Sequence, residues 1–322
     1  MSILKMNSLK GKKILVTGGC GFIGSHIVDR CVKEGAEVTI LDNLVSVKIT
    51  NIQPHLNKVR FIQKDLRDEK ALGDALSGVE FISHQAALRS VPKSVANPVE
   101  YHDVNINGTF RLFLKAKEKG IKRIAFASSS SVYGERFDFP EKESDQPMPI
   151  SPYAATKLIC EQYGYLFSKQ YKLGVVALRY FNVYGSRQSL DDEYAVVIPK
   201  FITCLLKEER PPIYGDGDQE RDFTYIENVV EANILALLRP DIEGEVFNIG
   251  NGSPNSVNQL LEFLNRIIGK NIKADYLPPR PGDVRKTHAD ISKATKLLGW
   301  QPRIGFYEGL EKAVEWFKKG GV

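Results

Sequence analysis

The chain has 322 residues, of which 43% are hydrophobic and 26% charged, the usage of ordinary globular proteins rather than of disordered or fibrous chains. Its net charge of +5 is too small and too dispersed to argue for nucleic acid. No apolar run approaches the ~20 residues of a membrane span, the N-terminus lacks a signal-peptide pattern, and the four cysteines and five histidines lack metal-ligand spacing. We therefore expect a cytoplasmic protein with reduced thiols and no bound metal, which binds neither nucleic acid nor membrane.

Between Lys12 and Asn182, short runs rich in β-branched residues alternate with amphipathic stretches. This alternation is typical of a parallel sheet that is covered by helices on both faces. We expect strands over 12–18, 37–43, 59–66, 79–87, 121–129 and 174–182. Helices are expected from near Phe22, from Asp68, over 98–119 and from Tyr153 to about Tyr171.

After Asn182 the alternation ends and amphipathic helices prevail. Helices are expected over 191–209, 227–238, 256–269 and 307–320, and short strands over 211–217, 221–226 and 245–250. The expected fold class is therefore α/β, a Rossmann-type doubly wound parallel sheet with a smaller α/β C-terminal domain. Residues 1–182 and 222–251 would form the first domain, and residues 183–221 and 252–322 the second.

The segment GGCGFIG places Gly18, Gly21 and Gly24 between the first strand and a helix that opens with Phe22 and Ile23. In a dinucleotide site the first glycine makes the tight turn, the second admits a pyrophosphate, and the third packs the helix against the strand. The helix N-terminus then faces the phosphates. A plain glycine turn has the same spacing, so the glycines alone do not distinguish a dinucleotide-binding loop from such a turn, and the next strand provides the evidence.

That next strand ends in Asp42, 24 residues past Gly18. This is close to the offset at which a carboxylate meets the adenosine ribose hydroxyls, where it repels a 2′-phosphate. The spacing predicts NAD rather than NADP as cofactor, with Asn43 assisting. Asp65, at the end of the third strand, either caps the following helix or contacts adenine.

The segment SPYAATK sets Tyr153 and Lys157 four residues apart, on one face of a predicted helix. A free phenol titrates near 10, so a tyrosine that acts as a base needs positive charge nearby, and Lys157 supplies it. Ser128 to Ser131 follow the strand 121–129, where ligands bind in open α/β sheets. A serine there either bonds the reacting hydroxyl or belongs to a solvated turn.

Together with HQAALRSVPKS, DVNINGT, LRYFNVYGSRQ, VIPKF, GDGDQERDFTYI and RPGDVRKTHAD, these motifs resemble the extended short-chain dehydrogenase/reductase family. The resemblance covers nearly the whole chain and is greatest to nucleotide-sugar 4-epimerases, in particular to the branch that acts on UDP-N-acetylhexosamines. It implies that Tyr153 is the catalytic base, Lys157 its activator and Ser129 the residue that positions the reacting hydroxyl. NAD would lie in the first domain and a UDP-sugar in the second.

The expected cofactor contacts combine the glycine loop with positions that match the family. They are Gly18, Gly21, Phe22, Ile23, Gly24, Asp42, Asn43, Asp65, Leu66, Ala86, Arg89, Asn105, Tyr153, Lys157 and Tyr180. The resemblance also implies substrate contacts at Ser129, Asn182, Val197, Tyr214, Arg221, Arg280, Asp283 and Thr287. Of these, Asn182, Arg221 and Arg280 match diphosphate contacts, Asp283 the uridine ribose and Tyr214 the uracil, and planar guanidinium groups suit phosphate oxygens.

Dehydratases of this family carry Thr-Asp-Glu where this chain has Ser129, Ser130 and Ser131, so their carboxyl groups fall at Ser130 and Ser131, and decarboxylases keep the glutamate at Ser131. The expected function is therefore a UDP-sugar 4-epimerase that interconverts UDP-glucose with UDP-galactose and their N-acetyl counterparts through a 4-keto sugar. UDP-glucuronate 4-epimerase is the alternative enzyme, and a non-catalytic protein that senses NAD(H) or UDP-sugar is the alternative of another class. The resemblance also implies a homodimer formed through the helices 98–119 and 153–171.

Thr287 matches a position where epimerases restricted to plain hexoses carry a bulky tyrosine. A small residue there leaves room for an acetamido group in both sugar poses. Val196 is larger than its counterparts in N-acetyl specialists, which favours use of both sugar types.

Overall fold

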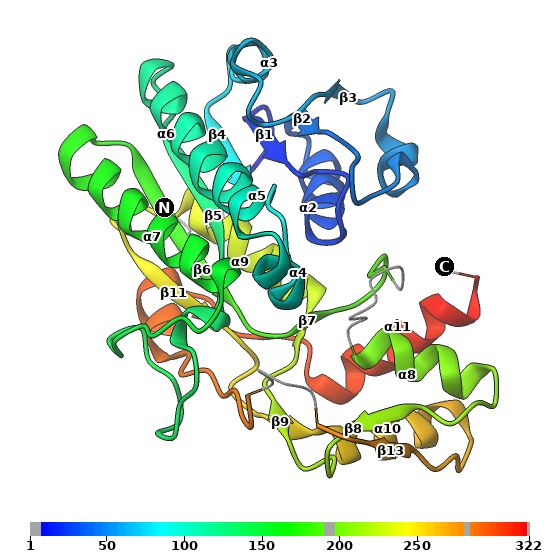
Figure 1. Cartoon of the computed structure of the whole chain (residues 1–322). Helices are drawn as coiled ribbons and strands as arrows, with labels where there is room; N and C mark the ends of the chain where they lie inside the picture. Colours follow the sequence, from blue (N-terminus) through cyan, green and yellow to red (C-terminus); the bar gives the residue numbers. More distant parts are fainter. Residues whose placement is uncertain (1–7, 190–196, 280–283, 321–322) are drawn as a thin grey trace.

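The computed structural model describes residues 8–189, 197–279 and 284–320. Seven parallel strands form its central sheet in the order β11-β6-β5-β4-β1-β2-β3 (Figure 1). They are β1 (Lys13–Thr17), β2 (Glu37–Asp42), β3 (Val59–Gln63), β4 (Phe81–His84), β5 (Arg123–Ser129), β6 (Gly174–Tyr180) and β11 (Val246–Ile249). This confirms the expected α/β class. The strand order reverses between β1 and β4, which is where open α/β sheets bind dinucleotides.

Helices cover both faces of this sheet (Figure 1). On one face α2 (Phe22–Lys33) contacts α9 (Ile226–Leu238), and on the other α6 (Gly108–Glu118) contacts α7 (Pro152–Tyr171). Alternate residues of β1 serve the two faces: Ile14 and Val16 join the core beneath α2 and α9, while Leu15 joins the core beneath α6 and α7. Burial on both faces explains why the strands are almost continuously apolar.

The helix expected over 98–119 is interrupted. It consists of α5 (Pro98–Tyr101), a π-helical turn η2 (His102–Asn107) and α6. Within this turn the Asn105 side chain accepts a hydrogen bond from the Leu88 N–H (2.8 Å) and donates to the Leu88 carbonyl (3.0 Å) and to Thr156 Oγ1 (3.1 Å). The wider turn thus ties α7 to the loop after β4, a detail that apolar periodicity does not reveal.

The C-terminal elements form the lower part of Figure 1. The helices of this lower part are α8 (Val197–Leu206), α10 (Val257–Ile268) and α11 (Phe306–Lys318). The strand that was expected over 221–226 is split into two short strands, β9 (Glu220–Arg221) and β10 (Thr224–Tyr225). The remaining elements are η1 (Ile49–His55), α3 (Glu69–Ala75), α4 (Val91–Ala96), η3 (Ser130–Tyr133), β7 (Val183–Tyr184), β8 (Pro212–Tyr214), β12 (Asn255–Ser256), β13 (Asp275–Leu277) and η4 (Ala294–Leu298).

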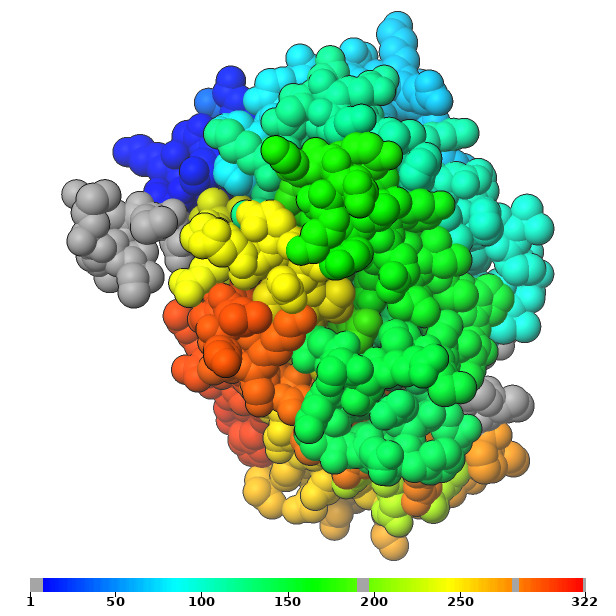
Figure 2. All heavy atoms as spheres, turned by 90° about the vertical axis from the view of Figure 1, so that its left-hand side faces the viewer, coloured from blue at the N-terminus to red at the C-terminus, as the bar shows by residue number. Residues whose placement is uncertain are grey.

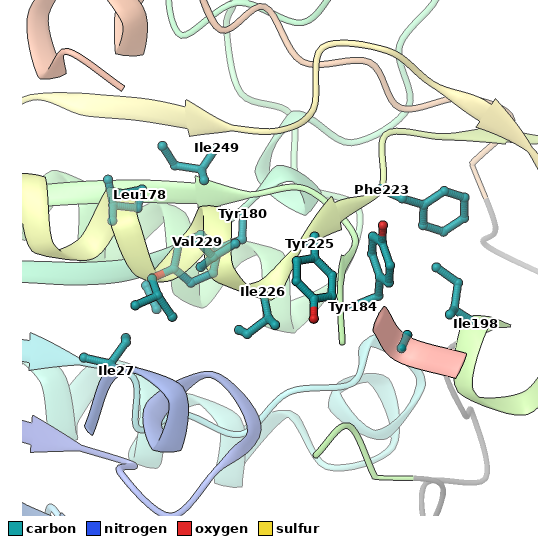
Figure 3. Packing of buried hydrophobic residues seen from close by; sticks show 14 of the residues in the cluster. Ile27, Leu178, Tyr180, Tyr184, Ile198, Phe223, Tyr225, Ile226, Val229 and Ile249 are labelled. Atoms are coloured by element: carbon teal, nitrogen blue, oxygen red, sulfur yellow. The ribbon is translucent and has the colours of Figure 1, made fainter. Parts of the chain in front are cut away.

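The apolar core beneath α2 and α9 continues from the sheet into these C-terminal elements (Figure 3). Leu178 and Ile249 of the sheet belong to the same buried cluster as Tyr184, Phe223 and Ile198. Phe223 also stacks on a ring of α11, that of Phe306, with centroids 5.0 Å apart. These C-terminal elements are therefore packed directly onto the sheet. No helix in the three described ranges is both long enough and apolar enough to cross a membrane.

Candidate active site

The glycine loop lies between β1 and α2, at the reversal point of the sheet. Gly18 has φ +67°, and a Cβ there would lie 2.7 Å from the Ala86 nitrogen. A Cβ on Gly24 would lie 2.1 Å from the Gly18 carbonyl oxygen, so α2 can approach the loop only with glycine at this position. Gly21 precedes α2, and no side chain within the described ranges caps the first turn, which Phe22 and Ile23 open. Its N–H groups therefore suit an anionic phosphate.

The acidic residues next to the loop are engaged in different ways. The buried Asp42 carboxylate accepts hydrogen bonds from the backbone N–H groups of Cys20 and Leu44, each at 2.9 Å, and burial raises its pKa. It thereby joins the end of β2 to the glycine loop. A carboxylate has further lone pairs for ribose hydroxyls.

Asp65 does not cap the next helix, because that cap is Asp68, which accepts a hydrogen bond from the Ala71 N–H at 3.0 Å. The Asp65 carboxylate instead bonds Arg67 (2.8 Å) and Asn43 Nδ2 (2.8 Å), which together hold its pKa well below the usual range. Leu66 is buried and faces Gly108 of α6. Asp65 and Asn43 thus contact each other directly, and Leu66 packs against α6.

The loop after β4 brings Ala86 and Arg89 to the same edge of the sheet. The Ala86 N–H donates to Thr17 Oγ1 (3.3 Å), and Tyr101 holds the Arg89 carbonyl with a hydroxyl bond of 2.6 Å. The Arg89 side chain is exposed, and its charge acts on the hydroxyl of Tyr153. The Asn105 amide bonds Leu88 and Thr156, and its expected contact with the cofactor stays a prediction.

Ser129, Tyr153 and Lys157 come together at the carboxyl end of β5. Ser129 ends the strand, and α7 begins with Ser151 as its cap, so that Tyr153 and Lys157 lie in its first two turns. Lys157 Nζ donates to the Ala127 carbonyl (2.8 Å) and lies 5.8 Å from the centroid of the Tyr153 ring. Ser129 Oγ accepts hydrogen bonds from the backbone N–H (3.2 Å) and the hydroxyl (2.8 Å) of Ser131, and the Ser129 side chain acts to lower the pKa of Tyr153.

Burial moves the pKa values of the two titratable groups in opposite directions. It raises the pKa of Tyr153, while the hydrogen bond from Ser129 and the charge of Arg89 lower it. Burial lowers the pKa of Lys157 to about 8, against the opposing effects of Cys160 and Glu161. Burial thus disfavours both charged forms, the phenolate of Tyr153 and the ammonium of Lys157, so acid–base catalysis by this pair depends on neighbouring groups that stabilise those charges.

Two buried groups lie on strands next to this trio, His84, which had no expected role, and Tyr180. His84 is buried on β4, 2.7 Å from Thr17 Oγ1 and 2.9 Å from Thr109 Oγ1, and burial together with Lys157 lowers its pKa to about 3. It is therefore neutral. Tyr180, expected as a cofactor contact, is buried on β6 and its hydroxyl accepts a hydrogen bond from Asn233 Nδ2 (2.8 Å).

Asn182 and Thr287, both expected as substrate contacts, are hydrogen-bonded to each other. Asn182 follows β6 with φ +33°, and its Nδ2 donates to Thr287 Oγ1 at 2.9 Å. Thr287 Oγ1 also accepts the backbone N–H of Asp222 at 3.1 Å. Val197 begins α8, Tyr214 ends β8, and Arg221 lies on β9 with Nη1 donating to the Glu220 carbonyl at 2.9 Å. Arg280, Asp283 and Val196 lie outside the described residues.

Asp222 is a further organising residue that the sequence reasoning missed. Its carboxylate is fully buried and accepts backbone N–H bonds from Asn251 (2.6 Å), Gly252 (3.0 Å) and Ala289 (3.0 Å). It joins the end of β11 to the segment that carries Thr287. An aspartate directly before the aromatic run FTY in ERDFTYI is the one signal that could have revealed it.

The family model described as "NAD dependent epimerase/dehydratase family" matches residues 14–250, and the chain belongs to this family. A putative UDP-glucose 4-epimerase of Methanocaldococcus jannaschii is 42% identical over 95% of this chain and 98% of its own. A UDP-glucuronate 4-epimerase of Thermodesulfobacterium geofontis is 38% identical over 95% and 96%.

Solved structures agree with this assignment. UDP-N-acetylglucosamine 4-epimerase from Methanobrevibacter ruminantium, in complex with UDP-N-acetylmuramic acid, has a TM-score of 0.92 and 43% identity, covering 97% of this chain and 99% of its own. UDP-glucose 4-epimerase from Thermus thermophilus, in complex with NAD, has a TM-score of 0.88 and 37% identity, covering 96% and 100%.

Proposed function

We propose that the chain is an NAD-dependent UDP-sugar 4-epimerase that acts on both plain and N-acetylated hexoses. The observation that carries this proposal is the gathering of Ser129, Tyr153 and Lys157 beside the glycine loop, with no carboxyl group at positions 129–131. A dehydratase would need an acid and a base there to eliminate water. The residues present suit proton transfer at one hydroxyl only.

The glycine loop fits NAD. Gly18 and Gly24 keep open a cradle that a Cβ would fill, the first turn of α2 offers uncapped N–H groups, and Asp42 stands at the end of β2. When bound, NAD supplies the acceptor and donor of hydride. Asp42 disfavours a 2′-phosphate by charge repulsion, so we expect NAD rather than NADP.

The side chains of the site handle the proton and the orientation of the sugar. Tyr153 accepts the proton of the 4-hydroxyl, and the nearby ammonium of Lys157 stabilises its phenolate. Ser129 bonds the same hydroxyl and keeps it beside Tyr153. Arg221, Arg280 and Asn182 hold the diphosphate, so that the 4-keto sugar can turn while its nucleotide stays bound. Tyr153 then returns the proton to the oxygen at carbon 4.

A product analysis with four UDP-sugars tests the activity. Purified protein is incubated with UDP-glucose, UDP-N-acetylglucosamine, UDP-glucuronate or UDP-xylose, without added reductant, and the C4 epimers are separated by anion-exchange chromatography. We expect UDP-galactose and UDP-N-acetylgalactosamine to form. Denatured protein should release NAD. A requirement for stoichiometric NADH, or release of mainly NADP, would contradict the proposal.

The same experiment decides between the alternatives. Conversion of UDP-glucuronate alone would establish a UDP-glucuronate 4-epimerase, the activity named for the relative from Thermodesulfobacterium geofontis. Binding of all four without conversion would establish a sensing protein. A sensor has no need for Ser129, Tyr153 and Lys157 in one place, which disfavours that reading.

The proposal also states which residues bind each ligand and how the chain assembles. We assign NAD to residues 1–182 and 222–251, and the UDP-sugar to residues 183–221 and 252–322.

We further propose a homodimer through the outer face of α5, α6 and α7, which Figure 2 shows side on. That face carries exposed apolar side chains: Val99, Leu114, Ile159, Tyr165, Leu166 and Tyr171. The cytoplasmic location stays a prediction, to be checked by cell fractionation.

A further inference from the structure

A buried row of polar residues crosses three neighbouring strands next to the catalytic trio. In the sheet register Arg179 of β6 pairs with Ser128 of β5 on one side and with Asn248 of β11 on the other. All three are at most 3% exposed. They are the last polar residues of their strands before the edge at which Ser129 lies. A buried cation in such a place needs a partner, because its desolvation is otherwise uncompensated.

That partner is Glu161 of α7, which is itself buried. The Arg179 guanidinium donates from Nε to Glu161 Oε1 (2.9 Å) and from Nη2 to Oε2 (2.7 Å), and the Ser128 hydroxyl donates to Oε1 as well. The guanidinium also lies over the Tyr133 ring, 4.7 Å from its centroid, and the Tyr133 hydroxyl donates to Asn248 Oδ1 (2.7 Å). A bidentate pair of this kind fixes geometry as well as charge.

The row and the catalytic trio share one short stretch of backbone. Lys157 lies one turn before Glu161 on α7 and donates to the carbonyl of Ala127. Glu161 is bonded to the next residue, Ser128, and the residue after that is Ser129. Lys157 and Glu161, one turn apart on α7, are therefore hydrogen-bonded to two successive residues at the end of β5, Ala127 and Ser128. Arg179 of the neighbouring strand holds the Glu161 carboxylate in place.

We propose that Glu161, oriented by Arg179, is a positioning residue that sets the end of β5 through Ser128 and provides the buried negative charge that keeps Lys157 cationic. This inference rests on the roles proposed above for Lys157 and Ser129. The effect has a mechanical part, which passes through the Ser128 hydroxyl, and an electrostatic part, which does not. The two parts can be separated by substitution.

Few charged or titratable groups of the described residues lie around Lys157. His84 on β4 is neutral, Tyr153 and Cys160 flank Lys157 on α7, and the Phe126 ring of β5 lies 5.1 Å from its Nζ. Glu161 and Cys160 are the groups that raise the pKa of Lys157, and burial has already raised the pKa of the Cys160 thiol to about 11, so at neutral pH Cys160 is uncharged. Removing the negative charge of Glu161 leaves the Arg179 guanidinium without its counter-charge. The positive charge of Arg179 then disfavours the ammonium form of Lys157 and lowers the pKa of Lys157 further.

The experiment compares Ser128→Ala and Glu161→Gln with the wild type, measuring kcat and KM against pH with UDP-glucose, and bound NAD in each preparation. Ser128→Ala should lower kcat about tenfold, with KM and the alkaline limb of the pH profile unchanged, because small displacements of catalytic groups are costly. Glu161→Gln should lower kcat at least as much and also move the alkaline limb to lower pH. Ser168→Ala, which removes a bonded hydroxyl from the far end of α7, is the matched control and should behave as wild type.

Two results would overturn the inference. One is a normal kcat and pH profile in both folded variants; the other is a loss in Ser168→Ala equal to that in Ser128→Ala, which indicates general loosening of α7. If Glu161→Gln fails to fold, Ser128→Ala still tests the mechanical part. Lys157→Met, assayed in parallel, separates the proposals: full activity in that variant contradicts the proposed function, whereas an inactive Lys157→Met with normal Ser128→Ala and Glu161→Gln contradicts this inference alone.

Discussion

At the scale of single residues, burial disfavours the charged forms of the two groups proposed to transfer the proton. Desolvation disfavours both the phenolate of Tyr153 and the ammonium of Lys157. The Ser129 bond and the Arg89 charge offset it for the tyrosine, and Glu161 offsets it for the lysine. The activity of Tyr153 as a base therefore depends on neighbours that never exchange a proton with the substrate.

Replacing Tyr153 by Phe removes the proton acceptor and little binding surface. We expect kcat to fall by about 10²- to 10⁴-fold, the usual contribution of a general base. Binding of the UDP-sugar, measured by isothermal titration calorimetry, should stay close to that of the wild type. Turnover near the wild-type rate would show that the base is another group.

Arg89 gives a prediction about pH. Its positive charge lowers the pKa of Tyr153, so Arg89→Gln should raise that pKa and move the rising limb of the kcat profile to higher pH. Activity at pH 7 should fall as a consequence. Arg89→Lys keeps the charge and should keep the limb in place. The NAD content of both variants is measured as well, because a loss of cofactor lowers activity without moving the limb.

Thr287 is the residue by which we expect the sugar size to be controlled. Thr287→Tyr should retain conversion of UDP-glucose and lose that of UDP-N-acetylglucosamine by steric overlap. The Thr287 hydroxyl also accepts bonds from Asn182 and Asp222, so bulk has to be separated from lost hydrogen bonds. Thr287→Val removes the bonds without adding bulk and should affect both substrates equally. Equal losses in Thr287→Tyr would place the size control elsewhere.

At the scale of elements, α2 can pack close to the glycine loop because Gly24 has no side chain. In Gly24→Ala the new Cβ would collide with the Gly18 carbonyl, so α2 has to move away from the phosphate site. We expect the purified variant to release little or no NAD on denaturation.

The matched control for that change is Gly73→Ala. Gly73 lies inside α3, and a Cβ there would meet nothing within 4 Å. This change should raise stability by about 0.5 to 1 kcal/mol, as alanine does over glycine inside helices, and leave NAD content unchanged. Equal NAD content in Gly24→Ala and the wild type would contradict the role given to the loop.

At the scale of the whole molecule, the sheet could be predicted from sequence more fully than the site. The seven core strands are continuous apolar runs, so their existence and class follow from composition and alternation. The interruption of the helix 98–119 could not be predicted, because one extra residue in a turn leaves apolar spacing nearly unchanged. Asp222 and Glu161 were missed for a related reason: a buried carboxylate looks like a surface one until its partners are known.

The proposed dimer is also tested at this scale. Leu166→Glu places a charge in the centre of the exposed apolar face of α7, where Leu166 is 42% exposed. In light scattering after gel filtration, the wild type should have twice the mass of one chain and the variant the mass of one. Leu297→Glu, on η4 with 39% exposure, is the control and should leave the mass unchanged. A monomeric wild type would contradict the dimer.

The placement of α9 has a consequence for how the protein is made. Helix α9 packs against β4, β5 and β6, yet it follows β6 in the chain by more than forty residues. While the ribosome is still translating that interval, the first six strands are already outside or leaving the tunnel, and one face of three of them has no cover. Apolar surface of this kind is what makes nascent intermediates prone to aggregate. We therefore expect the interval before α9 emerges to be a stage of synthesis at which the uncovered sheet face favours aggregation.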